Sequence, residues 1–395
     1  MRVLHVITRL IIGGAQENTI ASVRGLRQRH GVEARLLCGP DTGAEGSLQF
    51  ELADQPGVLE VIPALTRPIC PWKDTLALVQ LFRAFKRWTP DIVHTHSGKA
   101  GFLGRLAAAW AKVPVIIHTI HGPSFGPFQG VWANLALRTA ERIAGGVTTH
   151  FVCVADAMAK QYLAAGIGTP GQYTTIRSGF DLRPYLEASN DPALRQKFGF
   201  GPGDFVVGKI ARLFKLKGHE DLFAIAPELV AKCPQIKFLL VGDGPWRARF
   251  ERRLARLGLQ QHFAFAGLVR PDQVPQLVGI MDAVVHLSRR EGLPRALPQA
   301  LAAGKPVVAY DCDGAGEVCI PGETGFLVRP GDLCELARRI LQLVAEPALR
   351  AKFGQRGRAL VQDQFGVETM IDRLYELYQR LVRTLPASPA QARPA

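Results

Sequence analysis

Several patterns that define common protein classes are absent from this sequence of 395 residues. Its seven cysteines include no C-x-x-C pair, so neither a disulfide framework nor a zinc site is predicted, and a reducing compartment fits. No run of about 18 apolar residues occurs, so no transmembrane helix is expected. The apolar start of the chain is interrupted by Arg9 and followed by a Gly-Gly turn, unlike a signal peptide. These absences favour a cytoplasmic protein.

Acidic residues are fewer than basic ones, and the formal net charge is +14. Residues 1–185 hold 19 Lys and Arg against 12 Asp and Glu, and the remaining residues hold 29 against 22. The excess is therefore +7 in each part. A dedicated nucleic-acid-binding domain would concentrate its positive charge, so the even spread argues against nucleic acid as a partner.

One predicted helix, over residues 75–88, has aromatic residues at helical spacing beside a group of cations (Phe82, Phe85, Trp88; Arg83, Lys86, Arg87). This combination is compatible with an amphipathic surface resting on anionic lipid at the inner face of the cell membrane. The alternative is an ordinary helix with its aromatics in the core and its cations in solvent, and this alternative is favoured.

Apolar runs alternate with helical stretches along most of the chain, which predicts parallel, doubly wound α/β sheets. Strands are expected at 2–8, 34–38, 58–62, 92–95, 115–119 and 151–154, then at 206–210, 237–241, 263–266, 283–287 and 307–309. Two Rossmann-like domains are predicted, facing a central cleft. Their expected extents are 1–183 and 184–365, with a last helix at about 366–384 returning to the first domain. The Pro- and Ala-rich residues 385–395 are expected to be a flexible tail.

The stretch 287–309 carries the strongest functional signal. A strand end is followed by a polar loop, a short helix and a second apolar strand. Pro298 has no N–H and must lie in the first helical turn, so the helix is expected to begin near Pro294. Its free amides would open onto Glu291, Gly292 and Leu293. A helix N-terminus after a loop at the carboxyl edge of a parallel sheet is an anion site.

Glu291 cannot be a phosphate ligand in that site, because like charges repel. Its carboxylate is better suited to accept hydrogen bonds from hydroxyls of a neutral group attached to the phosphate. An anion site beside a hydroxyl acceptor is what a nucleotide-sugar requires. The alternative is that Glu291 only caps the helix through its backbone amides.

This stretch resembles the donor-site motif of family 4 (group 1) retaining glycosyltransferases, which have the GT-B fold. In that family two glutamates separated by seven residues frame the loop and helix, and this sequence has Glu291 at the first place and Gln299 at the second. The resemblance implies that Glu291 reads sugar hydroxyls and that residue 299 holds the ribose diol. A Gln amide can still bond a diol, but without charge.

Further motifs of the family occur in the expected order. Arg212 and Lys217 match its two cations after a strand and would neutralise the departing nucleotide diphosphate, so neither a metal nor another cofactor is expected. The alternative is two solvated surface cations. Gly242 lies in a turn that matches a family turn. Arg270, after the next predicted strand, could pack on a base.

In the first predicted domain, Gly13-Gly14 would let the backbone approach the donor closely, with Gly14 at the contact. The resemblance implies that His121, in the loop after a strand, reaches the reacting sugar. His118 lies within that strand, where a core histidine is expected. His94 and His96 lie in a segment (residues 91–108) that is similar to one in family members that build polysaccharides. Neither histidine is predicted to be catalytic.

The combined interpretation is a retaining hexosyltransferase that moves a sugar from a nucleotide-diphosphate sugar to an acceptor hydroxyl, in bacterial cell-surface polysaccharide or lipopolysaccharide assembly. Its catalytic candidates are His121 and Glu291, and its partners would be the donor, a glycan or glycolipid acceptor and an anionic membrane. A sugar-nucleotide epimerase and a non-catalytic nucleotide-sugar-binding protein stay open as alternatives. An NAD-dependent dehydrogenase is excluded because no complete G-x-G-x-x-G occurs in the right context.

Overall fold

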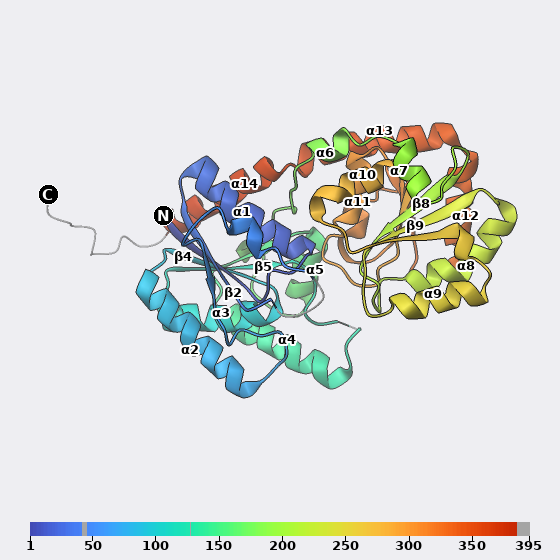
Figure 1. Cartoon of the computed structure of the whole chain (residues 1–395). Coiled ribbons are helices and arrows are strands. Elements are labelled where there is room, and N and C mark those ends of the chain that lie inside the picture. Colours follow the sequence, from blue (N-terminus) through green and yellow to red (C-terminus); the bar gives the residue numbers. More distant parts are fainter. Residues whose placement is uncertain (42–45, 127, 385–395) are drawn as a thin grey trace. The chain divides into compact units, whose positions relative to one another are not determined.

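The computed structural model describes residues 1–41, 46–126 and 128–384, so the predicted tail at 385–395 lies outside the described residues. The chain divides into two compact units (Figure 1). Unit 1 consists of Met1–Gly179 together with Val367–Ala395, and unit 2 consists of Phe180–Gly366. The boundary expected between residues 183 and 184 therefore lies four residues after the division in the structure.

Among the described residues, seven strands form the parallel sheet of unit 1, in the order β3-β2-β1-β4-β5-β6-β7. The strands are β1 (Arg2–Ile7), β2 (Glu33–Cys38), β3 (Leu59–Val61), β4 (Ile92–His96), β5 (Val115–Ile120), β6 (His150–Cys153) and β7 (Tyr173–Thr175). β7 was not predicted from the sequence, because its residues Tyr-Thr-Thr form no apolar run. The central strands are rich in Val and Ile and buried on both faces, as a sheet covered by helices requires.

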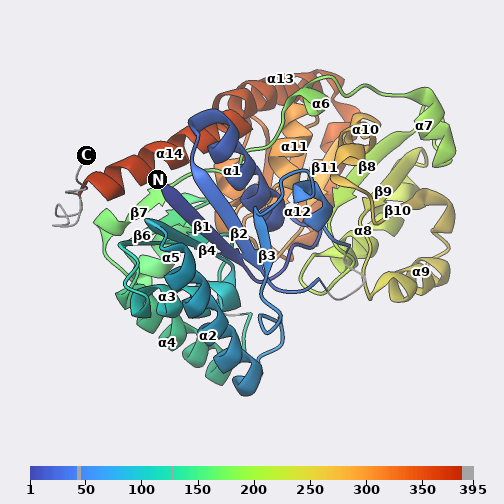
Figure 2. The ribbon, with the colours of Figure 1, turned by 60° about the vertical axis from the view of Figure 1, so that its left-hand side comes forward.

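Helices cover both faces of this sheet (Figure 2). They are α1 (Gly14–His30), α2 (Pro71–Trp88), α3 (Gly98–Trp110), α4 (Val131–Gly146), α5 (Asp156–Ala164) and α14 (Val367–Arg383). The core on one face joins α1 and α14 to alternate residues of β1 and β2, and the core on the other face joins α2 and α3 to the residues between them. Alternation along each strand thus decides which helices a side chain meets.

The last helix, α14, is an integral part of unit 1 although it is far from the rest of that unit in sequence. Its buried side chains include Ile371, Leu374 and Tyr378. A Cβ added to Gly25 of α1 would lie 2.0 Å from Ile371 Cδ1, so only glycine permits the two helices to approach this closely.

Six strands form the parallel sheet of unit 2 within the described residues, in the order β10-β9-β8-β11-β12-β13. They are β8 (Phe205–Ile210), β9 (Ile236–Val241), β10 (Phe263–Gly267), β11 (Ala283–His286), β12 (Val307–Tyr310) and β13 (Gly325–Val328). The helices are α6 (Arg183–Leu186), α7 (Pro192–Lys197), α8 (His219–Lys232), α9 (Arg247–Arg256), α10 (Val274–Gly279), α11 (Ala296–Ala302), α12 (Leu333–Ala345) and α13 (Pro347–Gln364). The two doubly wound sheets confirm the predicted fold class.

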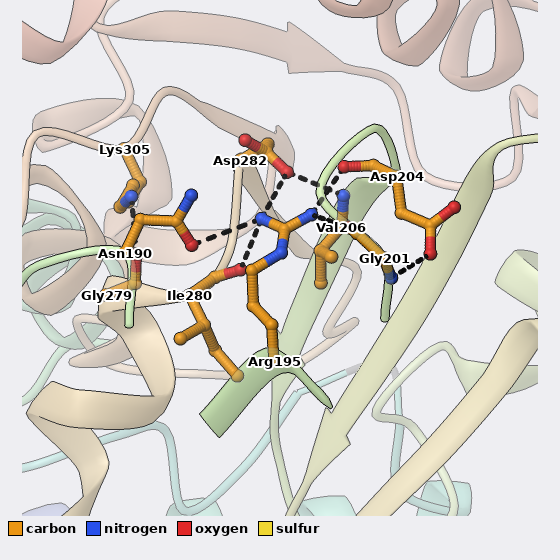
Figure 3. A network of polar contacts seen from close by, with 9 residues as sticks. All are labelled: Asn190, Arg195, Gly201, Asp204, Val206, Gly279, Ile280, Asp282 and Lys305. Carbon is orange, nitrogen blue, oxygen red and sulfur yellow. Dashed lines mark hydrogen bonds and ion pairs between the residues drawn. The ribbon is translucent and has the colours of Figure 1, made fainter. Parts of the chain in front are cut away.

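A buried arginine ties α7 to the sheet of unit 2 (Figure 3). Arg195 lies on α7, and its guanidinium donates to the backbone oxygen of Asp204 at 2.5 Å and contacts the carboxylate of Asp282 at 3.4 Å. Asp282 in turn accepts a hydrogen bond from the backbone nitrogen of Val206 at 2.8 Å. The charge is therefore buried with several partners, which is the condition under which a buried arginine is tolerated.

Three aromatic residues in the second half of α2 face the core rather than solvent. Phe85 is buried, and Phe82 and Trp88 are partly buried and pack against the same core. The suggestion that these three side chains form a lipid-facing surface is therefore wrong, and the favoured alternative of a helix with core aromatics is confirmed. The described residues include no helix long and apolar enough to cross a membrane.

Candidate functional site

Two loops at the carboxyl edge of the unit 2 sheet bring together most of the predicted donor residues. β8 and β11 pair in the sheet, so the loops that follow them are neighbours. Lys217, after β8, forms an ion pair with Oε1 of Glu291, after β11. Ser288 Oγ donates to the same carboxylate oxygen at 2.8 Å. Glu291 therefore does not cap the following helix with its side chain, and the capping alternative is excluded.

The Glu291 side chain is held in its ionised form. Burial by itself would raise the pKa of this carboxyl group, but the Lys217 ammonium, His286 and the hydrogen bond from Ser288 outweigh it and lower the pKa below its usual value. The backbone nitrogen of Glu291 donates to Asp313 Oδ2 at 2.8 Å, which fixes the main chain as well. The loop thus presents a rigid carboxylate acceptor.

A second lysine, which no sequence motif indicated, lies close enough to feel the charges of this pair. Lys209 on β8 is only 1% exposed. Burial, and then the charge of Lys217, lowers its pKa to about 7, although Asp221 and Glu291 oppose the shift. A pKa so far below the usual value is rare for this residue type. A lysine inside an apolar strand was the signal that could have identified it.

Arg212 and Gly242 lie on neighbouring loops of the same sheet edge. The backbone nitrogen of Ala211 donates to Val241 and that of Leu213 to Asp243, which joins the loop after β8 to the loop after β9. Gly242 has φ 130°, and an added Cβ would lie 2.4 Å from the Ala211 oxygen. Gly242 is thus required for the contact between the loops, which places Arg212 at the edge.

The short helix of the motif, α11, begins at Ala296, two residues later than predicted. Gly292 and Leu293 lie in the loop before it, where the Gly292 oxygen accepts from the backbone nitrogen of Gly314 at 2.9 Å. Gln299 is in the middle of α11 and is buried. Within the described residues its side-chain amide forms no hydrogen bond, so its polar head is available for a ligand.

Arg270 is a predicted donor residue in an exposed position. Its side chain is 69% exposed, and its guanidinium forms a two-pronged contact with Asp272, at 3.1 and 2.8 Å. This pairing leaves the planar face of the guanidinium in solvent, so a role in stacking on a base stays a prediction.

The predicted residues of unit 1 lie at the carboxyl edge of its own sheet. Gly14 is the first residue of α1, directly after β1 and its loop. His121 follows β5, and its Nε2 lies 3.0 Å from Nδ1 of His96. Burial lowers the pKa of His121 to about 4, so the ring is neutral at neutral pH.

Three further histidines lie within strands β4 and β5 of the unit 1 sheet. His94 and His96 are two residues apart on β4 and share the face of α1 and α14, where both are buried. His118 is buried too, and its Nδ1 lies 2.9 Å from Thr95 Oγ1. His118 is therefore a satisfied core histidine, as the sequence predicted.

Comparisons with known proteins agree with this geometry. The model of a glycosyl transferase 4-like domain matches residues 13–179, and the model of group 1 glycosyl transferases matches residues 190–360. The chain is 26% identical over 326 residues to UDP-Gal:alpha-D-GlcNAc-diphosphoundecaprenol alpha-1,3-galactosyltransferase of Escherichia coli, covering 81% of this chain and 83% of that protein. It is 29% identical over 325 residues to the putative glycosyltransferase EpsD of Bacillus subtilis (strain 168), covering 80% and 83%.

Among solved structures, HepE of Anabaena in complex with UDP and glucose is similar, with a TM-score of 0.80 and 27% identity, covering 96% of this chain and 99% of that one. Two doubly wound domains and matches of this extent define a glycosyltransferase with the GT-B fold. The chain belongs to the group 1 glycosyltransferases, family 4.

Proposed function

We propose that this glycosyltransferase transfers a sugar from a nucleotide-diphosphate sugar to an acceptor hydroxyl with retention of anomeric configuration. The observation that carries this proposal is the ion pair between Lys217 and Glu291 at the carboxyl ends of two adjacent parallel strands. That edge of a doubly wound sheet is where nucleotide ligands bind. Glu291 accepts hydrogen bonds from the sugar hydroxyls, and Gln299 holds the ribose diol.

In the proposed reaction, the acceptor oxygen bonds to the anomeric carbon on the face from which the diphosphate departs. The bond between that carbon and the phosphate oxygen breaks, and the acceptor proton passes to the departing phosphate. Arg212 and Lys217 stabilise the negative charge that develops on the diphosphate. Two cations at this position make a metal or other cofactor unnecessary in the proposed mechanism. His121 is the residue that accepts a hydrogen bond from a hydroxyl of the reacting sugar.

The acceptor we propose is a glycan or glycolipid of bacterial cell-surface polysaccharide synthesis, at the cytoplasmic face of the membrane. The names of the relatives support this: one is a galactosyltransferase acting on a diphosphoundecaprenol-linked sugar, and another is a capsular polysaccharide biosynthesis glycosyltransferase of Staphylococcus aureus. UDP-glucose is bound in one structure of HepE, which supports a nucleotide-sugar donor.

A surface formed by α2 and α4 supports contact with the membrane. Trp72 and Leu76 on α2, and Trp132 and Leu135 on α4, are exposed, with Trp72 76% and Trp132 82% accessible. Both helices pack on α3. Exposed tryptophans beside exposed aliphatic residues are typical of surfaces that insert into the lipid headgroup region.

A thermal-shift panel of nucleotide-sugars identifies the donor, because a ligand that binds the native state raises its apparent stability. The donor so found is then incubated with candidate acceptors, and the anomeric configuration of the product is read by NMR. Retention in the product is expected. Conversion of the donor to another sugar nucleotide without acceptor would favour the epimerase, and binding without any turnover would favour a non-catalytic protein.

Removal of the cations tests the diphosphate site directly. Arg212→Ala and Lys217→Ala should each weaken nucleoside-diphosphate binding by about 2 kcal/mol, the cost of losing a charge-assisted contact. Lys215 lies exposed in the same loop, so Lys215→Ala is the matched control and should leave the affinity nearly unchanged. Calorimetry measures all three. If Arg212→Ala and Lys217→Ala bind the diphosphate as tightly as Lys215→Ala and the wild type, the diphosphate binds elsewhere.

A further inference from the structure

A continuous chain of hydrogen bonds crosses the interior of unit 1 and ends at His121. It begins at Tyr378 on α14, whose hydroxyl oxygen lies 3.4 Å from Nε2 of His5 on β1. His5 Nδ1 lies 2.9 Å from Nε2 of His96 on β4. His96 Nδ1 then lies 3.0 Å from Nε2 of His121. Every nitrogen of the two middle rings thus has a partner in the chain.

A branch leaves the chain at Tyr378. The same hydroxyl oxygen lies 2.5 Å from Nδ1 of His94, and Nε2 of His94 lies 2.6 Å from Thr119 Oγ1. Tyr378 therefore contacts two imidazole rings with a hydroxyl group that has a single hydrogen.

All the rings of the chain are neutral at neutral pH. Burial lowers the pKa of His5 to about 3 and that of His121 to about 4, and it lowers the pKa values of His94 and His96 well below the usual value. A neutral imidazole has one N–H and one bare nitrogen, so each ring donates on one side and accepts on the other. The direction of every hydrogen bond in the chain is therefore set by the direction of the first.

Tyr378 sets that first direction. Hydroxyl donors make shorter hydrogen bonds than N–H donors, so the two distances favour a hydroxyl that donates to His94 at 2.5 Å and accepts from His5 Nε2–H at 3.4 Å. His5 Nδ1 is then bare and accepts from His96 Nε2–H. His96 Nδ1 in turn accepts from Nε2–H of His121.

We propose that Tyr378, His5 and His96 are positioning residues that hold His121 as its Nε2–H tautomer, leaving Nδ1 as a bare nitrogen for a substrate hydroxyl. Within the described residues, Nδ1 of His121 has no partner. In the proposed function, this nitrogen accepts a hydrogen bond from a hydroxyl group of the sugar. The opposite tautomer would direct an N–H at that position and select a hydrogen-bond acceptor instead.

The same rings satisfy the distance requirement of a metal site, because one nitrogen each of His5, His94 and His96 lie within 4.8 Å of one another. A metal would need bare nitrogens aimed at a common point. The contacts of 2.9 and 3.0 Å instead join the rings in pairs, with each ring aimed at its neighbour. The geometry is that of a hydrogen-bonded chain.

The test is the tautomeric state of His121 in the full-length protein with 15N-labelled histidine, read by NMR at pH 7.5. His121→Gln assigns the signal. The wild type should have the proton on Nε2. Tyr378→Phe removes the hydroxyl that orients the chain, so His121 should become a mixture of tautomers. His118→Gln is the control, because His118 is equally buried but lies outside the chain, and it should leave His121 unchanged.

A proton on Nδ1 in the wild type, or an unchanged tautomer in Tyr378→Phe, would overturn the inference. One equivalent of zinc in the purified protein, lost on chelation with a change in the His5 and His96 signals, would overturn it too. In a transfer assay, Tyr378→Phe should lower kcat about tenfold and His118→Gln less than about twofold.

The inference on the tautomer rests on the proposed function only for the role of Nδ1, so the two can fail separately. If the spectrum is as expected but the protein turns over no nucleotide-sugar, the inference on the tautomer stands and the proposed function is contradicted. If the protein is an active transferase but His121 has its proton on Nδ1, only the inference on the tautomer is contradicted.

Discussion

Lys209 gives a test of the electrostatics beneath the donor site at the scale of one residue. Burial lowers its pKa from 10.5 to about 7, so between these values the unfolded chain binds more protons than the native protein. The stability of the wild type should therefore rise with pH across that window, by on the order of a few kcal/mol. Below pH 7 Lys209 is protonated in both states, so the native protein carries the full free-energy cost of burying a charged lysine.

Lys209→Met should abolish this pH dependence. The variant should be more stable than the wild type near pH 7, with the difference shrinking toward pH 10, as measured by urea unfolding. Lys232→Met is the control at an exposed lysine of α8 and should show no such trend. Parallel pH profiles for the wild type and Lys209→Met would mean that Lys209 stays charged in the native protein.

Individual residues were predictable where their role depends on nearby sequence. Glu291 and Lys217 were identified from local motifs, and the structure brings them into contact. The partners of the histidines were not predictable, because His5 and Tyr378 are 373 residues apart. Contact between residues so far apart depends on how α14 packs against the rest of unit 1, which no local sequence pattern encodes.

At the scale of elements, Arg195 provides a measure of how firmly α7 is tied to the sheet. Arg195→Met would leave Asp282 and several backbone oxygens without their donor, and the loss of one partner from a buried pair costs about 3–5 kcal/mol. Arg338→Met, at an exposed arginine paired with Glu335, should cost less than about 1 kcal/mol. Urea unfolding compares the two. Equal costs would show that the Arg195 network is not stabilising.

Most elements followed from the sequence, because buried parallel strands read as continuous apolar runs and the helices between them as periodic ones. The misses have local causes. β7 reads Tyr-Thr-Thr and contains no apolar run, whereas β13 (Gly325–Val328) does contain one, which the prediction omitted. α11 begins after Arg295 rather than at Pro294, because the loop before it is held by Gly314 and Asp313, which come later in the chain.

At the scale of the whole molecule, membrane contact through α2 and α4 can be tested with vesicles. Trp72 and Trp132 lie near the beginning of helices that run in the same direction, because each helix connects parallel strands. The double variant Trp72→Ser, Trp132→Ser should lose most of the binding to vesicles containing phosphatidylglycerol in a sedimentation assay. Trp110→Ser is the control. Trp110 is 61% exposed but is the last residue of α3, whereas Trp72 and Trp132 lie near the first residues of their helices. Equal losses in both proteins would contradict the assigned surface.

The central claim is that the stretch 287–309 is a donor site organised around Glu291, and Glu291→Gln tests it most directly. Transfer rate with the best donor, nucleoside-diphosphate affinity and melting temperature are measured on the same preparation. Because the amide keeps the shape but not the charge that accepts the sugar hydroxyls, turnover should fall about 100-fold or more. The variant should still fold and bind the free nucleoside diphosphate. Near-normal turnover together with a lowered melting temperature would contradict the account, since Glu291 would then serve only the structure of its loop.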